Sequence, residues 1–287
     1  MMMYENEVKI VGTITYTKET VCYTRTDREE LYADLYIPEK GAGTTPLLVM
    51  IHGGAWKAGS KEMNQEWGPF LAQQGYCVMS IDYRLATPEY ATWPGVTEDV
   101  RAALAYMREH AAEYQVDPAR VGLIGDSCGA HLSILLGLEE EFSQSVRAIV
   151  GVYGVYDVKQ WWEHTQTSRT DDPVGLFMGG TPSEMPDAYL EASPMYRLEQ
   201  ALQKGQMKET PFLVVWGDED EVVSCQQSKD FVQLLARYQV PHRAIEYPGH
   251  KHFWFSILPW LEGGGIGDEP NAQLIPELLD FLQDSLK

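Results

Sequence analysis

A ten-residue run near the middle of the chain constrains the fold more than any other stretch. Residues 122–131 read Gly-Leu-Ile-Gly-Asp-Ser-Cys-Gly-Ala-His, which contains a Gly-x-Ser-x-Gly pattern centred on Ser127. An apolar run, Val121 to Ile124, precedes the pattern, and a helical pattern of small and apolar residues, Ala130 to Leu138, follows it. A strand, a sharp turn and a helix in this order are typical of a nucleophile elbow, which exposes a serine hydroxyl above a sheet.

The residues around Ser127 fit the same geometry. Glycine at positions 125 and 129 removes Cβ atoms that would collide where the strand and the helix approach each other. The helix that follows directs its N-terminal N–H groups at negative charge forming near the serine. Cys128 comes directly after Ser127, and we expect it to contribute its backbone N–H rather than a nucleophilic thiol.

Strand-like and helix-like segments alternate along most of the chain. Short β-rich runs over residues 8–37 indicate an antiparallel lead-in. Apolar runs further on predict buried parallel strands, separated by segments with helical periodicity. The predicted strands are 47–51, 76–81, 121–124, 146–152, 211–216 and 243–247, and the predicted helices are 62–74, 97–114, 128–138, 224–238 and 274–286. This alternation predicts an α/β fold: a mainly parallel twisted sheet with helices on both faces.

The domain organisation follows from the length and from one irregular segment. A chain of 287 residues is compatible with a single α/β domain spanning residues 1–287. Residues 157–210 interrupt the alternation with several prolines and two adjacent tryptophans, and they are too long for a simple connection. We therefore expect this segment to be an inserted lid or cap.

Charge and composition exclude several classes of partner. The formal net charge is −20, from 22 basic and 42 acidic residues, which disfavours nucleic acid and anionic membranes as partners. The sequence has no apolar run long enough to span a membrane and no N-terminal secretory signal pattern. We therefore expect a cytoplasmic protein with reduced cysteines, although a processed secreted form and a homo-oligomer both stay open.

Backbone donors are predicted beside the serine. His52-Gly53-Gly54 follows the predicted strand 47–51, where successive glycines let N–H groups face a cavity without hindrance from side chains. The N–H groups of Gly53, Gly54 and Cys128 are expected to form an oxyanion hole, which stabilises the charge that develops on a carbonyl oxygen under attack.

A serine nucleophile also needs an imidazole base and a carboxylate that orients it. In an elbow fold these follow in the order serine, acid, histidine. Asp218 and Asp220 come after one predicted strand, and His250 and His252 come after the next. Asp220 is favoured by motif resemblance, whereas Asp218 suits a role in bracing its loop. His252 is favoured because an aromatic pair that could wall the site follows it, but His250 stays open as the base.

The other histidines have simpler interpretations than catalysis. His131 lies one helical turn after Ser127 and is expected to be a buried, hydrogen-bonded histidine, and His164 is expected to be exposed. Metal-ligand spacing and phosphate-binding loops are absent from the sequence, so neither a metal nor an organic cofactor is expected. Five aromatic residues are candidates for a substrate pocket: Trp56, Trp161, Trp162, Phe177 and Trp254.

Three motifs together resemble the α/β-hydrolase superfamily. They are residues 52–56 (His-Gly-Gly-Ala-Trp), 82–85 (Asp-Tyr-Arg-Leu) and 125–131 (Gly-Asp-Ser-Cys-Gly-Ala-His). The chain is most similar to carboxylesterases related to hormone-sensitive lipase and to the BD-FAE (bacterial feruloyl esterase-like) domain, over about residues 30–256. The resemblance implies a Ser127–Asp220–His252 triad. The family often has a third glycine where Ala55 stands, and a methyl group fits there if φ is negative.

These features predict a serine carboxylesterase that works through an acyl-enzyme. The expected partner is a small-molecule or carbohydrate ester, such as a short-chain, acetyl or feruloyl ester of plant carbohydrate. Two alternatives stay open. One is an amidase or peptidase on the same fold, similar to an arylformamidase or an acyl-peptide hydrolase. The other is a non-catalytic binding protein with a hydrolase-like fold.

Overall fold

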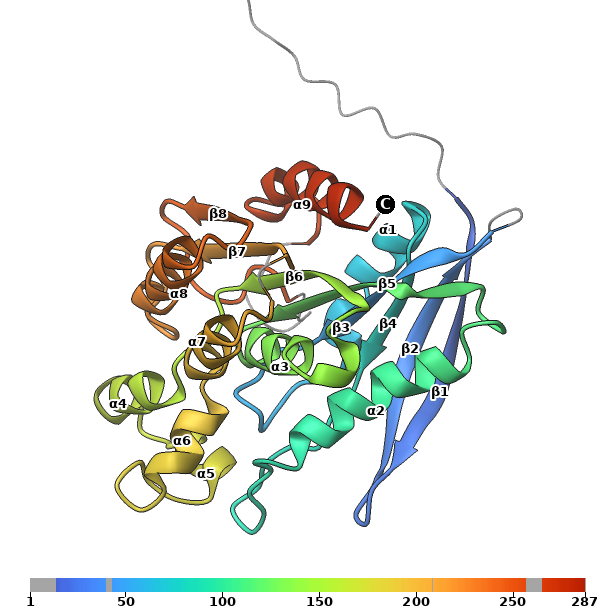
Figure 1. The fold of residues 1–287 in the computed structure, drawn as a ribbon. Coiled ribbons are helices and arrows are strands. Elements are labelled where there is room, and N and C mark those ends of the chain that lie inside the picture. Colours follow the sequence, from blue (N-terminus) through green and yellow to red (C-terminus); the bar gives the residue numbers. More distant parts are fainter. Residues whose placement is uncertain (1–13, 40–42, 208, 257–264, 287) are drawn as a thin grey trace, which may run out of the picture.

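A computed structural model describes residues 14–39, 43–207, 209–256 and 265–286, and its centre is one eight-stranded sheet (Figure 1). The strand order is β1-β2-β4-β3-β5-β6-β7-β8. Strands β1 and β2 pair antiparallel, β2 is antiparallel to β4, and the pairs from β4 to β8 are parallel. The strands are β1 (Tyr16–Arg25), β2 (Glu30–Pro38), β3 (Thr45–Ile51), β4 (Cys77–Ile81), β5 (Val116–Asp126), β6 (Val146–Val152), β7 (Phe212–Gly217) and β8 (His242–Tyr247).

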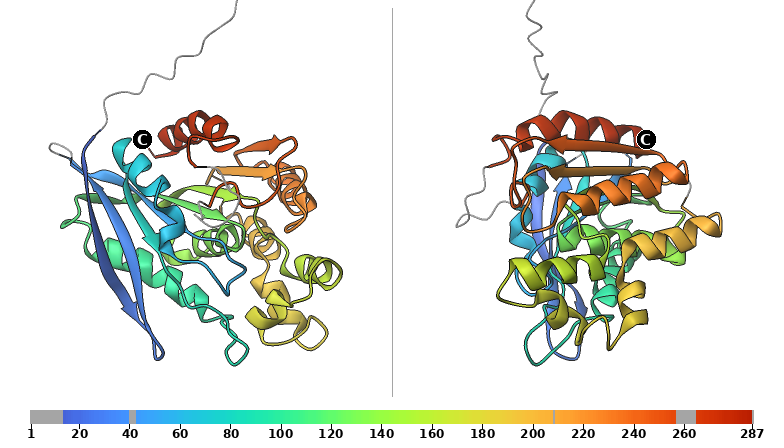
Figure 2. Two further views of the ribbon diagram at one scale, coloured as in Figure 1. Left: turned by 180° about the vertical axis from the view of Figure 1, so that it is seen from behind. Right: turned by 90° about the vertical axis from the view of Figure 1, so that its left-hand side faces the viewer.

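Helices cover both faces of this sheet, and that is why its central strands are apolar at nearly every position. All residues of β4 and β7 are buried. Helices α1 and α9 lie on one face, and α2 and α3 lie on the other (Figures 1 and 2). The helices outside the 157–210 segment are η1 (Lys61–Asn64), α1 (Trp67–Gln73), α2 (Val96–Glu109), α3 (Cys128–Gly137), η2 (Glu140–Phe142), α8 (Cys225–Arg237) and α9 (Asn271–Ser285).

The irregular segment between β6 and β7 folds into four helices, which lie together beyond α3 in Figure 1. Proline stands at the start of three of them, where its missing N–H is not needed. Asp157 and Asp172 cap α4 and α5 by accepting hydrogen bonds from the N–H groups of Gln160 and Gly175. The four are α4 (Val158–Ser168), α5 (Pro173–Met178), α6 (Pro186–Ala192) and α7 (Pro194–Gln203).

The predicted fold class is confirmed, with differences at the ends of elements. The predicted helix 62–74 is two elements, η1 and α1. The predicted helix 97–114 ends at Glu109, where His110 leaves the helical conformation with a φ of −97° and a ψ of 14°. Turns over residues 110–115 then lead into β5. Residues 8–13 of the predicted lead-in lie outside the described residues. In the part of the chain that the structure describes, we find no helix with the length and apolarity needed to cross a membrane.

Candidate active site

Ser127 occupies a strained turn between β5 and α3, as a nucleophile elbow requires. Its φ and ψ are 53° and −122°, and its N–H donates to the Val152 carbonyl at 2.9 Å. The two flanking glycines are required by the packing. A Cβ at Gly125 would lie 2.2 Å from the Gly129 carbonyl oxygen, and a Cβ at Gly129 would lie 2.0 Å from the Ile51 oxygen. The close approach of strand and helix therefore fixes the position of the serine.

Asp220 and His252 meet at the carboxyl ends of β7 and β8. His252 Nδ1 lies 2.6 Å from Asp220 Oδ2, and both side chains are buried. The other carboxylate oxygen, Oδ1, accepts the N–H groups of Val222 and Val223 at 2.9 Å each, so the carboxylate cannot rotate freely. In the neutral imidazole, the tautomer with its proton on Nδ1 donates to this carboxylate and leaves Nε2 as the ring nitrogen that can accept a proton. His252 Nε2 is buried without a hydrogen-bond partner among the described residues.

Asp218 and His250, the alternatives to Asp220 and His252, make other contacts. The exposed Asp218 accepts the Gly249 N–H at 2.6 Å and so braces the loop after β8, as its sequence context indicated. The ring of His250 packs at the edge of Tyr247, with 6.2 Å between ring centroids, and no contact with Asp220 is found in the described part of the chain. The structure therefore pairs Asp220 with His252 and leaves the other two residues outside the pair.

The residues beside Ser127 hold the His252 loop against the elbow. Asp126 accepts a hydrogen bond from the Ser256 hydroxyl. Tyr153 directly follows Val152, whose carbonyl accepts the Ser127 N–H. Its ring centroid lies 4.2 Å from that of His252. The Tyr153 hydroxyl oxygen also accepts the N–H groups of Phe255 and Ser256 at 3.1 and 3.3 Å. The serine and the imidazole thus share one small region at the edge of the sheet, although the Ser127 hydroxyl makes no hydrogen bond within the described residues. Such bonds commonly tighten only when substrate is bound.

The glycine loop after β3 offers one donor fewer than the sequence predicts. The Gly53 N–H donates to Asp126 Oδ1 at 3.0 Å, so it is not free for a substrate oxygen in this conformation. This differs from the expected role of Gly53, and the cause is a buried carboxylate that the motif does not reveal as an acceptor. The N–H groups of Gly54 and Cys128 have no acceptor among the described residues. Ala55 has a φ of 54°, so the condition under which a methyl group fits there without strain, a negative φ, is not met.

The Cys128 thiol is a buried structural group. Its sulfur accepts the Trp56 N–H at 3.3 Å and lies 3.5 Å from the Tyr83 hydroxyl. Burial raises the pKa of Cys128 to about 12, so the thiol stays protonated at neutral pH and cannot act as a thiolate nucleophile. The side chain holds the glycine loop in place.

Most of the aromatic residues expected to line a pocket are packed in the core, and this part of the prediction is wrong. Trp56, Trp161 and Phe177 are fully buried, with Trp56 stacked on Phe177 at 4.0 Å and edge-on to Trp161 at 5.3 Å. Trp254 is also buried and packs edge-on against two tyrosine rings. Trp162 is half-buried and donates to Asp172 at 3.2 Å. The sequence shows that these residues are aromatic, but it does not show the direction in which their rings point.

The 157–210 segment, which the sequence predicts to be a lid or cap, contacts the loop that carries Asp220 and the glycine loop after β3. Trp161 Nε1 donates to the Val222 carbonyl at 2.9 Å, and His164 Nε2 lies 3.0 Å from the Glu221 carbonyl. Helix α4 therefore braces the loop that carries Asp220. The Lys57 ammonium forms an ion pair with Asp171, which links the glycine loop to the same segment.

His131 is a core histidine, as expected. It accepts the Trp56 indole N–H on Nδ1 at 3.3 Å, so Nε2 carries the proton and donates to the Ala192 carbonyl at 2.8 Å. Burial lowers the pKa of His131 to about 3, and the ring is neutral at physiological pH.

Asp126, directly before Ser127, is a buried carboxyl whose pKa is strongly shifted. Burial raises its pKa to about 6, against the lowering effects of the Ser256 hydroxyl, His252 and the Gly53 N–H. Because this value lies above that of an unfolded aspartate, the folded protein favours the protonated carboxyl. Its contribution to the free energy of unfolding is therefore fully present below about pH 4 and is lost as the pH rises through about 6.

Replacing Asp126 by asparagine should isolate the pH-dependent contribution of this carboxyl to the free energy of unfolding. The difference in free energy of unfolding between the wild type and Asp126→Asn should fall by about 1.4 kcal/mol per pH unit between about pH 4 and 6, and become constant above pH 7. Urea unfolding of both proteins across this range measures the difference directly. A difference that does not change with pH would mean that Asp126 does not titrate differently in the folded and unfolded states.

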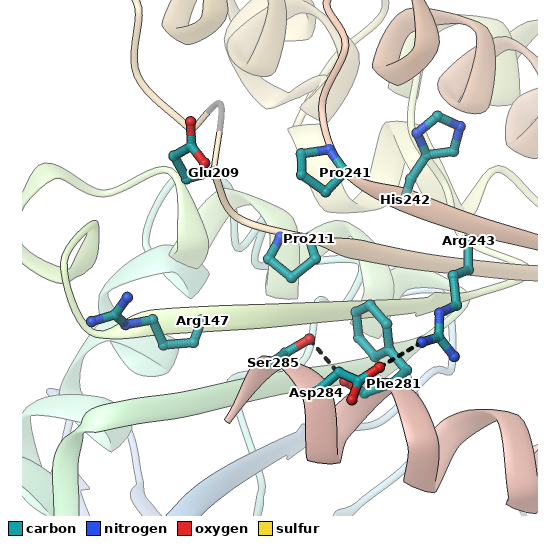
Figure 3. Close-up of a pocket in the computed structure, with 9 residues that line it drawn as sticks. All are labelled: Arg147, Glu209, Pro211, Pro241, His242, Arg243, Phe281, Asp284 and Ser285. Carbon is teal, nitrogen blue, oxygen red and sulfur yellow. Dashed lines mark hydrogen bonds and ion pairs between the residues drawn. The ribbon is translucent and has the colours of Figure 1, made fainter. Parts of the chain in front are cut away.

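A cavity of about 420 Å³ lies away from these residues (Figure 3). Arg147, Pro211 and His242 line it at the amino ends of β6, β7 and β8, together with Asp284 of α9. Parallel strands place their carboxyl ends at the opposite edge of the sheet, where Ser127 and Asp220 are found. This cavity is therefore separate from the candidate active site.

Comparisons with known proteins agree with this architecture. The BD-FAE family model matches residues 33–235. Esterase LipC of Mycobacterium tuberculosis is 33% identical over 260 residues, which cover 84% of this chain. The chain spans only 59% of the length of LipC. A truncated carbohydrate esterase from gut microbiota is 25% identical with a TM-score of 0.74, covering 96% of this chain and 97% of that one. Carboxyl esterase 2 from the fungus Tuber melanosporum is 23% identical with a TM-score of 0.73, covering 97% and 90%.

Proposed function

The chain belongs to the BD-FAE family, and from that premise we propose that it hydrolyses carboxylic esters with Ser127 as nucleophile. The observation that carries the proposal is the 2.6 Å contact between His252 Nδ1 and Asp220 Oδ2 beside a serine in a strained elbow. This contact leaves Nε2 as the base, and a base is what a serine hydroxyl needs to become nucleophilic at neutral pH. The esterase names of the relatives support the same reaction.

The proposed reaction proceeds in two stages. Ser127 Oγ forms a bond to the ester carbonyl carbon while His252 Nε2 takes the hydroxyl proton, and Asp220 stabilises the resulting imidazolium. When the bond to the alcohol oxygen breaks, the proton passes from Nε2 to that oxygen. Water then attacks the acyl-enzyme by the same route, with His252 first taking and then returning a proton, and releases the acid.

The negative oxygen of each tetrahedral intermediate needs donors that are already in place. We assign this role to the N–H groups of Gly54 and Cys128, with the N-terminus of α3 behind the second of them. Gly53 then acts indirectly, because its N–H holds the loop to Asp126 at 3.0 Å. Removal of one such donor typically costs about 3–4 kcal/mol of transition-state stabilisation.

The packing of the aromatic residues favours short acyl groups over feruloyl groups. Three of the five candidate pocket residues, Trp56, Trp161 and Phe177, pack on one another in the core and offer no aromatic surface to a feruloyl ring. The proposed substrates are therefore acetyl or other short-chain esters. A carbohydrate as the alcohol portion draws support from the similarity to a carbohydrate esterase.

The proposal is tested by comparing an ester with its matched amide. The wild type should hydrolyse 4-nitrophenyl acetate with a burst of nitrophenol and should act on 4-nitroacetanilide far more slowly. A fluorophosphonate probe should label one residue, and peptide mapping should identify it as Ser127. Equal rates on the two substrates would favour the amidase alternative. Absence of both turnover and labelling would favour a non-catalytic protein.

A further inference from the structure

One large apolar side chain next to His252 is exposed. Phe253 is 39% exposed, and the only other well-exposed large hydrophobic residues in the described ranges are Tyr32 and Leu190. The rings of Phe253 and His252 pack edge-on, with 4.6 Å between centroids and an interplanar angle of 89°. The buried Tyr153 packs against the same imidazole at 4.2 Å. The imidazole therefore has one buried aromatic neighbour and one that faces solvent.

The backbone at Phe253 is strained, and its neighbours maintain the strain. Its φ is 67°, a left-handed conformation that a bulky residue rarely adopts. On one side, His252 is held by Asp220 at 2.6 Å. On the other side, the Trp254 carbonyl accepts the Asn271 amide at 2.6 Å, and the next two N–H groups donate to Tyr153. A strained and exposed phenyl ring fixed beside a reactive imidazole calls for a functional explanation.

The reaction chemistry indicates which part of an ester this ring would meet. If Ser127 and His252 act as proposed above, the oxygen of the leaving alcohol must come within hydrogen-bond reach of His252 Nε2. The carbonyl oxygen lies instead at the Gly54 and Cys128 N–H groups. The alcohol portion therefore lies beside the imidazole and the exposed ring of Phe253, and the acyl portion points elsewhere.

We propose that Phe253 is a specificity-determining residue on which the alcohol portion of the ester packs. The favoured substrates carry an alcohol built on a six-membered ring, either aryl or pyranose, because an aryl ring presents a π face and a pyranose chair a face of C–H groups to the phenyl ring. Because kcat/KM reports acylation, when the alcohol is still attached, this contact affects kcat/KM. It does not affect deacylation, which takes place after the alcohol has left.

The test compares acetate esters that differ only in the alcohol: phenyl acetate, an acetylated methyl xyloside and methyl acetate. Phe253→Gly removes the ring and also suits the positive φ, so this variant should fold at least as well as the wild type. We expect its kcat/KM to fall about tenfold for one or both ring esters and to change less than about twofold for methyl acetate. Phe253→Tyr should retain the wild-type preference. Leu190→Ala, which removes an exposed apolar side chain from α6, should leave all three values unchanged.

Two results would overturn the proposal. The first is an equal loss for ring esters and methyl acetate, which would mean that Phe253 only supports His252. The second is a slower deacylation step after the nitrophenol burst with 4-nitrophenyl acetate. A wild type that hydrolyses none of these esters would instead contradict the proposed function itself, so the two failures are distinguishable.

Discussion

Ser127→Ala should lose about 10⁴- to 10⁶-fold in kcat toward 4-nitrophenyl acetate and should show no burst of nitrophenol. The hydroxyl is the atom that forms the acyl-enzyme, so its removal deletes the covalent pathway rather than weakening it. The residual rate would come from water activated by His252 and from the backbone donors at Gly54 and Cys128. Pre-steady-state kinetics and intact-protein mass measurement after mixing with the ester check both points.

Ser133→Ala is a matched control for this substitution. Ser133 lies on the same helix α3, and its hydroxyl is buried without a partner among the described residues. Removing that hydroxyl should leave kcat unchanged and should not lower the free energy of unfolding, because no hydrogen bond is lost. If Ser127→Ala kept wild-type turnover while Ser133→Ala lost it, the assignment of the nucleophile would be wrong.

The fold and the paired acid and histidine followed from local patterns in the sequence. Apolar runs without polar interruptions indicated strands covered on both faces, and β6 begins and ends where the pattern predicted. Asp220 and His252 each follow a predicted strand, and the carboxyl ends of parallel strands share one edge of a sheet. A contact between one of the two aspartates and one of the two histidines could therefore be expected. The choice of Asp220 and His252 depended on motif resemblance and on the aromatic pair after His252, and it left His250 open.

What the sequence did not reveal depends on contacts between distant segments. The Gly53 N–H is taken by Asp126, a residue 73 positions away, so the choice of oxyanion donors depends on a hydrogen bond that no local pattern encodes. The packing of Trp56, from the loop after β3, against Trp161 of α4 likewise depends on tertiary structure. Hydrophobicity indicates that a side chain is buried somewhere, but the direction of the ring is set by the neighbours that tertiary structure supplies.

Asp220→Asn should lower kcat/KM about 10⁴-fold while the protein stays folded. The asparagine carbonyl oxygen can still accept the N–H groups of Val222 and Val223, which the Asp220 Oδ1 accepts at 2.9 Å each. Its amide nitrogen then faces His252 Nδ1 and donates to it. The imidazole proton must move to Nε2, and the ring can no longer take a proton from Ser127.

Asp218→Asn separates this tautomer effect from a general loss of loop structure. Its amide oxygen can still accept the Gly249 N–H, as Asp218 does at 2.6 Å, and the side chain is exposed. We expect kcat/KM within about threefold of the wild type. The two variants carry the same chemical change on one loop, two residues apart. A large loss of kcat/KM confined to position 220 therefore supports a carboxylate that orients His252. Similar losses at both positions would instead show that activity depends on the loop as a whole and not on the Asp220–His252 contact.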